Sequence, residues 1–293
     1  MNPIVITSND LLSKNNFIAK NGKELSFNNF WYYTTLDTAN KILDNKCIHV
    51  SNLSNMNDVD EIKLHEKEKD FVHCLCLCNS NTEKIPMWYL YSGIAGQGVS
   101  LGFTPAVMLN FINEIDKVTT VDKSVTLHKG IDFELDYGWI FYRKNNYKSQ
   151  VLYKGKWYSL KDPDNFEKDN FFIKSYPWEY EKEFRIIIRN ITSTSYDKLI
   201  IDIEPIYNKL KLRLAPELSN NSYEEIIHNL SGFSKYFLTV LKKSDLSINM
   251  KLFDRNFESF IDYLKSNSID NNIDCSKICD AISNNCKLMD TKK

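Results

Sequence analysis

The sequence predicts an α+β protein that carries a helical C-terminal appendage. Short runs of aromatic and β-branched residues, typical of strands, are separated by segments with helical periodicity through most of the chain. After Pro216 the strand signals become rare, and 222–245 and 254–290 have helical patterns. We therefore expect an irregular N-terminal lead-in at 1–29, an α+β domain at 30–216 and a helical appendage at 217–293.

The α+β domain begins with its clearest strand signal, the run Phe-Trp-Tyr-Tyr-Thr-Thr. Helical periodicity follows directly, and Thr35 or Asp37 is in place to cap that helix. The charged stretch 61–70 favours a solvated helix face, and 118–172, rich in aromatic residues and polar turns, favours β-structure. The other elements alternate: strands are expected at 30–35, 47–51, 71–78, 99–103 and 183–189, and helices at 36–43, 85–91 and 105–116.

Composition and charge limit the classes of protein to which the chain can belong. Its 293 residues include 17 Phe, 16 Tyr and 5 Trp, enough for a substantial core. The 37 basic and 38 acidic side chains nearly cancel, so overall charge favours neither a nucleic-acid nor a membrane partner. The sequence has no signal-peptide pattern and no apolar run of about 20 residues. The 7 Cys do not space like a disulfide framework. We expect a cytoplasmic protein without membrane contact.

Two glutamates at the start of the last strong strand are the first candidates for catalysis. Side chains two apart in a strand share a face, so Glu181, Glu183 and Arg185 align while the apolar residues between them face the core. Two carboxylates about 7 Å apart along a strand can take different roles in one reaction. One stabilises a developing cation or binds a sugar hydroxyl, and the other positions an acceptor. The alternative is an exposed polar face with a Glu–Arg ion pair, which contributes little to stability.

Three further segments offer binding groups. The aromatic strand 31–35 can hold a planar ring, although such strands are more typical of a core. His49 and Ser51 share a strand face, but a Ser beside a turn such as 54–58 commonly bonds its own backbone. The glycines between 93 and 102 lead into a strand and not a helix, which argues against a Rossmann or P-loop site.

Cysteines and a basic stretch give two weaker signals. Cys74, Cys76 and Cys78 share one strand face, but zinc sites favour paired cysteines on turns, so we expect small core side chains and no metal. Between 142 and 157, basic residues alternate with aromatic ones, a pattern that suits the stacking and clamping of single-stranded nucleic acid. A solvated β-meander has the same pattern.

Taken together, the motifs resemble one family. In order, they are aromatic-Tyr-Thr-Thr-Leu-Asp, a helix ending Ile-Leu-Asp-Asn, Ser-Asn-x-x-x-Met-Asn-Asp, Met-Trp-x-x-Tyr, Gly-Val-x-Leu-Gly-Phe and Trp-x-Tyr-Glu-Lys-Glu-Phe-Arg. The combination is far more specific than any single motif. It resembles the bacterial domain of unknown function family 2971 over about residues 30–225.

The layout of that family resembles, more distantly, the ADP-ribosyltransferase fold, which has a split β-sheet core with flanking helices. The likeness implies a catalytic glutamate at Glu183, with Glu181 as its companion in a Glu-x-Glu arrangement. It implies NAD contacts from Tyr32, where a His is more familiar, and from Ser51 on the second strand. The remaining implied contacts are Tyr33, Trp88 and Tyr91 around the nicotinamide, Arg143 or Lys174 on the pyrophosphate, and Arg185 orienting the catalytic carboxylate.

The resemblance implies an NAD-dependent ADP-ribosyltransferase that acts as a toxin-like effector in bacterial anti-phage defence. NAD is then a substrate, and a carboxylate stabilises positive charge on its ribose without a metal. The acceptor is RNA, DNA or protein, and the basic-aromatic stretch favours nucleic acid. Such an enzyme needs restraint, so an antitoxin or other regulatory protein is an expected partner. Two alternatives stay open: a non-catalytic nucleotide-binding sensor that uses the same pocket, and a metal-independent nuclease that uses His49, His73 or His128.

Overall fold

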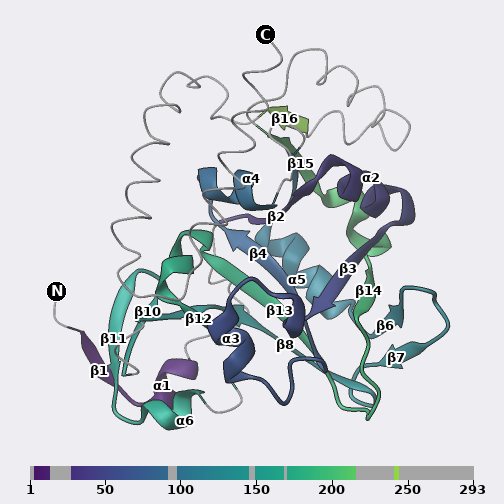
Figure 1. The fold of residues 1–293 in the computed structure, drawn as a ribbon. Coiled ribbons are helices and arrows are strands. Elements are labelled where there is room, and N and C mark those ends of the chain that lie inside the picture. Colours follow the sequence, from purple (N-terminus) through teal and green to yellow (C-terminus); the bar gives the residue numbers. More distant parts are fainter. Residues whose placement is uncertain are drawn as a thin grey trace, which may run out of the picture.

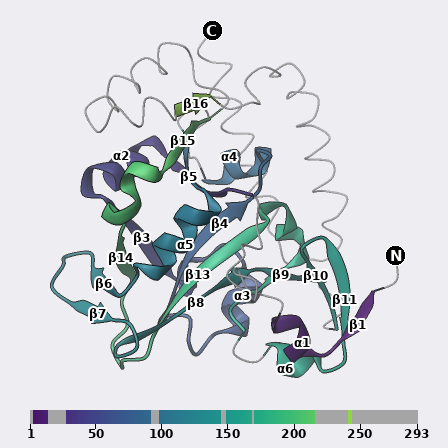
Figure 2. The same cartoon turned by 180° about the vertical axis from the view of Figure 1, so that it is seen from behind.

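The computed structural model has two mixed β-sheets and a few short helices (Figures 1 and 2). It confirms the mixed α and β character predicted for the chain. The predicted helical appendage lies outside the described residues except for a three-residue strand, Leu241–Lys243, where a helix was expected. The structure describes residues 3–13, 28–91, 98–144, 149–167, 170–215 and 241–243.

The larger sheet has the order β16-β15-β5-β2-β4-β3-β14-β6-β7, and β13 joins it to β8 through β4. Its neighbours are antiparallel except for β15 and β16. Each strand predicted from the sequence in this part of the chain is present, within one or two residues. The strands are β2 (Phe30–Thr35), β3 (Cys47–Asn52), β4 (Val72–Asn79), β5 (Gly98–Phe103), β6 (Lys117–Thr120), β7 (Thr126–His128), β8 (Phe133–Trp139), β13 (Glu183–Asn190), β14 (Lys198–Asp202), β15 (Lys211–Leu214) and β16 (Leu241–Lys243).

The smaller sheet corrects the prediction of an irregular N-terminal lead-in. The apolar triplet at its start forms β1, which pairs in parallel with β11, and the following helix α1 (Ser8–Leu12) is capped by Thr7 and buries Leu11. The run Ile-Val-Ile was a strand signal, but three residues are too few to separate a strand from an apolar coil. The order of this sheet is β1 (Ile4–Ile6), β11 (Lys156–Leu160), β10 (Gln150–Tyr153), β9 (Phe141–Arg143) and β12 (Ile173–Ser175).

Short helices cover the larger sheet on both sides. Helix α3 lies in front of the sheet in Figure 1, whereas α5 is in front in Figure 2, seen from behind. Thr35 caps α2, as one of the two predicted caps, because its hydroxyl accepts the backbone N–H of Thr38. The helices are α2 (Leu36–Asn45), α3 (Val59–Leu64), α4 (Ile85–Tyr91), α5 (Pro105–Asn113) and α6 (Pro163–Glu167), with 3-10 turns η1 (Leu53–Asn55), η2 (Tyr176–Glu181) and η3 (Glu204–Lys209).

Strand β4 shows how the larger sheet opens. One edge of β4 pairs with β13 over its length. The other edge pairs with β2 only at Cys78 and Asn79, and with β3 only at His73 and Cys74. No ladder partner from either strand faces residues 75–77 on that edge in the described structure. The two strands therefore leave β4 at opposite ends, and a gap opens between them.

No helix among the described residues has both the length and the apolarity required to cross a bilayer.

Candidate functional site

A cavity of about 390 Å³ occupies the gap between β2 and β3. Its floor is the unpaired edge of β4, its walls come from β2, β3 and α4, and the start of β13 closes one side. The structure therefore brings Tyr32, Ser51 and Glu183, three residues predicted from separate motifs, to one cavity. The side chains that the chemistry below uses are Tyr32, Tyr33, Ser51, Tyr91, Lys174, Glu181 and Glu183, all of which line it.

The Glu183 carboxylate is held by two cations. The Nε of Arg185 donates to Oε1 at 2.7 Å, and the Nζ of Lys174 donates to Oε2 at 3.2 Å. The alternative of an exposed Glu–Arg pair is wrong, because Glu183 is buried and Arg185 is completely so. Burial alone raises the pKa of Glu183, but Arg185 and Lys174 overcome it and hold that pKa below its usual range. The carboxylate is therefore ionised at neutral pH.

Glu61 completes this arrangement from the far side of Arg185. Both nitrogens at the end of the guanidinium donate to the Glu61 carboxylate, and Nη1 also donates to the carbonyl of Phe171 at 2.9 Å. The prediction of a solvated face over 61–70 is wrong for Glu61, which is buried. Asp58 places it there: the Asp58 side chain caps α3 and accepts the backbone N–H of Ser175 at 2.9 Å.

Glu181 connects the ion pairs to the wall of the cavity. Its Oε2 accepts from Lys174 Nζ at 2.5 Å, and its Oε1 accepts the hydroxyl of Tyr91. That hydroxyl in turn accepts from Nδ2 of Asn57 at 3.4 Å. Burial raises the pKa of Glu181 to about 7, and neighbouring Glu183 adds to the effect of burial while Lys174 opposes it. Glu181 can therefore gain or lose a proton near neutral pH.

The β2 aromatics form one wall of the cavity. Burial raises the pKa of Tyr32, and so does the nearby Cys76 across the gap. Trp88 packs edge-on against Tyr33 with ring centroids 4.7 Å apart, and its Nε1 donates to Glu83. Trp88 was predicted to sandwich the nicotinamide. It does not line the cavity, and it packs behind Tyr33 instead.

Two of the predicted cations, Arg143 and Arg185, do not line the cavity. Arg143 lies on β9 in the smaller sheet and pairs with Glu167, so it does not line the cavity. Arg185 is also outside the lining and acts through Glu183. Of the residues predicted for the pyrophosphate, only Lys174 reaches the cavity, where it already binds two carboxylates.

The basic-aromatic stretch 142–157 is a β-meander in the described residues. Tyr142 and Tyr153 are buried, so neither ring stands on an open surface where bases could stack. This favours the second interpretation given for that pattern. Tyr147 and Lys148, which belong to the same stretch, lie outside the described residues.

The histidines predicted for the nuclease alternative and the cysteines of β4 lie in different surroundings. His49 lines the cavity, and burial, with Lys198, lowers its pKa. His73 is fully buried with Nε2 2.7 Å from the carbonyl of Tyr196. Cys74, Cys76 and Cys78 line the cavity floor, where burial raises the pKa of each thiol. No grouping of His, Cys, Asp or Glu in the described part of the chain is suited to a metal ion.

Sequence reasoning missed Glu61 and Asn57. Glu61 sits in a run of charged residues that matches a solvated helix, and only the tertiary fold brings α3 to Arg185. Asn57 belongs to the motif Met-Asn-Asp, which marked this segment as part of the family pattern. Nothing in the sequence indicated that Asn57 contacts Tyr91.

Part of this site lies in a segment that is similar to a known family. Residues 87–186 match the family described as "Protein of unknown function (DUF2971)". The matched segment holds Trp88, Lys174, Glu181, Glu183 and Arg185, whereas the β2 and β3 motifs lie before it. No curated protein matches the chain. The match over residues 87–186 supports the predicted resemblance to this family for that part of the chain.

Proposed function

We propose that the cavity between β2 and β3 binds NAD and that the protein transfers ADP-ribose from it. The observation that carries this proposal is the ionised carboxylate of Glu183, fixed by Arg185 and Lys174 beside a cavity walled by tyrosines. Each of its oxygens accepts one cationic donor. A carboxylate has about four lone-pair sites, so one is still open to a ligand hydroxyl after these two donors and Cys76. A volume of about 390 Å³ is within the usual range of small-molecule sites.

In the proposed reaction, the bond between C1′ of the ribose and the nicotinamide nitrogen breaks. The electron pair leaves with neutral nicotinamide, and positive charge develops on the ribose. The Glu183 carboxylate stabilises that charge and accepts a ribose hydroxyl. Tyr32 and Ser51 offer hydroxyls to the ribose, and Tyr33 offers a ring face to the nicotinamide.

Glu181 has the protonation behaviour needed for the second half of the reaction. An acceptor hydroxyl or amine attacks C1′ and must lose a proton. A carboxylate with a pKa of about 7 accepts that proton near neutral pH. Tyr91 and Lys174 hold Glu181 in place for this step.

The first test uses labelled NAD and the purified full chain, with and without a bacterial lysate. We expect nicotinamide release from the protein alone and label transfer with the lysate. Digestion of the products with RNase, DNase or protease then identifies the acceptor class. Glu183→Gln should lower the rate by about 100-fold or more. Glu134→Gln, which removes a carboxylate from an exposed ion pair on neighbouring β8, is the matched control and should keep full activity.

Because Glu183 is buried, its variant is checked for folding by circular dichroism. Tyr32→Phe and Ser51→Ala do not disturb the ion pairs and should each slow the reaction by about tenfold. Folded wild-type protein that releases no nicotinamide and transfers no label would reject the transferase.

One observation favours a second candidate, a non-catalytic nucleotide-binding sensor. Both oxygens of Glu183 already have cationic partners, as they would in a purely structural ion-pair cluster. This candidate predicts NAD or nucleotide binding in calorimetry, weakened by Tyr32→Phe, without release of nicotinamide.

The proposed biological role is that of a toxin-like effector in anti-phage defence, with nucleic acid as acceptor and an antitoxin as the restraining partner. The family resemblance supports the defence role, whereas the choice of nucleic acid as acceptor rests on the basic-aromatic stretch 142–157. Expression in a bacterial host should be toxic for the wild type and harmless for Glu183→Gln at equal protein level. Equal toxicity of the two would reject a role that depends on this site.

A further inference from the structure

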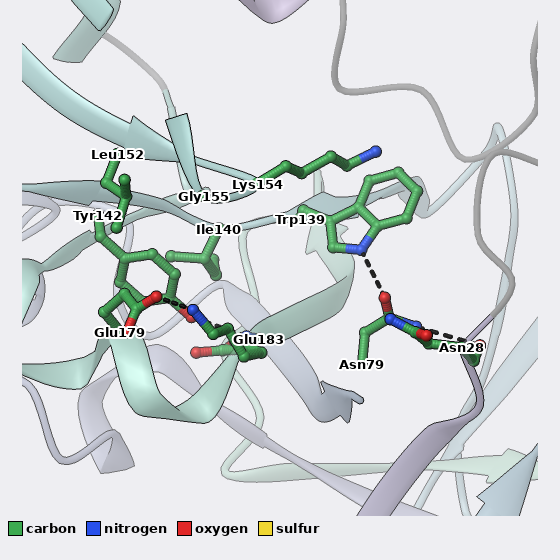
Figure 3. A pocket seen from close by; sticks show the side chains of 11 residues that line it. Asn28, Asn79, Trp139, Ile140, Tyr142, Leu152, Lys154, Gly155, Glu179 and Glu183 are labelled. Carbon is green, nitrogen blue, oxygen red and sulfur yellow. Dashed lines mark hydrogen bonds and ion pairs between the residues drawn. The ribbon is translucent and has the colours of Figure 1, made fainter. Parts of the chain in front are cut away.

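A second hollow, of about 450 Å³, lies between the two sheets (Figure 3). Most of its lining comes from the end of β8, strand β9, the β10–β11 hairpin and the η2–β13 turn, and Asn28 and Asn79 complete it. Apolar side chains, including Ile140 and Leu152, form its back wall. Glu183 is the one residue shared with the cavity described above, so the η2–β13 turn separates the two hollows.

The hairpin turn fixes a lysine at the rim of this hollow. Tyr153 pairs with Lys156, which leaves a two-residue turn with positive φ at both Lys154 (47°) and Gly155 (76°). The lysine side chain folds back, and its Nζ lies 3.1 Å from the centroid of the Trp139 ring. Figure 3 shows the chain of Lys154 running along the hollow to that ring.

The position of Trp139 is itself fixed. Its Nε1 donates to Oδ1 of Asn79 at 3.2 Å, and its ring packs edge-on against Phe184 at 5.3 Å between centroids. The π face of Trp139 therefore holds the ammonium group of Lys154 at the hollow. No carboxylate pairs with Lys154 in the described part of the chain.

Of the four charged side chains that line the hollow, three are held in ion pairs. Lys182 lines it together with Glu179, and these two form an ion pair. Lys182 has a φ of 47°, so the backbone turns sharply there. Glu183 is paired with Arg185 and Lys174. Lys154 is thus the lining charge that has no partner of opposite charge among the described residues. A positive rim above an apolar wall suits a ligand that has both an anionic group and a flat apolar body.

We propose that this hollow binds a nucleotide unit, with its phosphate at Lys154 and its base against the wall formed by Ile140 and Leu152. Lysine binds phosphate as a point charge, and a planar base fits an apolar slot. The unit comes either from a free mononucleotide or from single-stranded nucleic acid. Binding here does not depend on NAD cleavage in the first cavity, and it is tested by a separate measurement.

The hollow also touches the candidate catalytic residue from behind. The hydroxyl of Tyr142, which lines the hollow, accepts the backbone N–H of Glu183 at 2.7 Å (Figure 3). A ligand seated against Tyr142 therefore lies one hydrogen bond away from the backbone of Glu183.

The test is a calorimetric titration of the full chain with inorganic phosphate, with AMP and with a short single-stranded oligonucleotide. Lys154→Met keeps most of the side-chain volume and removes the charge. Lys156→Met, two residues along the same hairpin, removes an exposed charge that does not line the hollow and is the matched control. We expect AMP or the oligonucleotide to bind, with affinity reduced about tenfold or more in Lys154→Met and unchanged in Lys156→Met.

The three ligands distinguish a free mononucleotide from single-stranded nucleic acid as the source of the bound unit. Binding of AMP without a gain for the oligonucleotide identifies a free nucleotide, and tighter binding of the oligonucleotide identifies a nucleic-acid strand. Saturable quenching of tryptophan fluorescence that disappears in Trp139→Phe would locate the ligand in this hollow. The proposal is overturned if neither AMP nor the oligonucleotide binds, if inorganic phosphate binds as tightly as AMP, or if the two lysine variants lose affinity equally.

Discussion

The two ends of β13 carry the same kind of ion pair in opposite surroundings. At its start, Arg185 and Glu183 have side chains 0% and 2% exposed. Near its end, Arg189 and Glu134 have side chains 41% and 50% exposed. Water screens the second pair and competes for its donors, whereas the first has lost its water and depends entirely on its partners. One strand therefore holds both a fixed electrostatic site and an ordinary surface contact.

The largest expected effect comes from removing the cation at the buried end. Arg185→Met leaves the carboxylates of Glu61 and Glu183 buried without their shared partner. We expect the free energy of unfolding to fall by about 3–5 kcal/mol at pH 7, measured by denaturant titration. The loss should shrink at lower pH, where Glu61, whose pKa is raised by burial, takes up a proton. A loss below about 1 kcal/mol would show that the surroundings of these carboxylates relax and admit water.

Glu181→Gln should change how stability depends on pH. The folded-state pKa of Glu181, about 7, lies above its ordinary value of 4.5. The folded protein therefore binds a proton that the unfolded chain has released, and this contribution to stability is lost as pH rises through that window. The slope is at most about 1.4 kcal/mol per pH unit.

The measurement is the difference in unfolding free energy between wild type and Glu181→Gln at pH 5, 6, 7 and 8. We expect the wild type to lose about 2–3 kcal/mol relative to the variant across that range. Glu183 does not contribute to this difference. Its pKa is lowered, so it titrates at more acidic pH, and it is present in both proteins. Parallel curves would mean that Glu181 is ionised throughout.

The smallest effect is expected at the exposed end. Glu134→Gln breaks the pair with Arg189, and the free energy of unfolding should change by no more than about 0.5 kcal/mol. High salt should leave even that difference near zero. A change above about 2 kcal/mol would mean that exposure does not separate the two ends of β13.

The same contrast shows what the sequence could predict. The apolar alternation of 183–189 predicted the strand correctly. Glu183, predicted from the same pattern as a catalytic carboxylate, lines the cavity, and its catalytic role stays a prediction. The burial of Glu183 and Arg185 could not be predicted. Local alternation shows that a strand face is polar, but it does not show whether another element covers that face. That cover is Glu61, which is 124 residues away from Arg185 along the chain.

Other errors have local causes. Arg143 was predicted to reach the pyrophosphate, but its strand belongs to the smaller sheet, where Glu167 pairs with it. Sheet membership follows from non-local pairing and leaves little trace in a single strand. The N-terminal strand β1 was missed because it is short and gains its stability from parallel pairing with β11.

The gap between β2 and β3 has a consequence for how this protein can change over time. The floor of the cavity is main chain, the unpaired edge of β4 at 75–77, so its shape is set by strand pairing. Tyr32, Ser51 and Cys76 project from that frame, and exchanging them leaves the ladders intact. A lineage can therefore alter which small molecule is recognised through a few point substitutions, while the scaffold stays under separate selection.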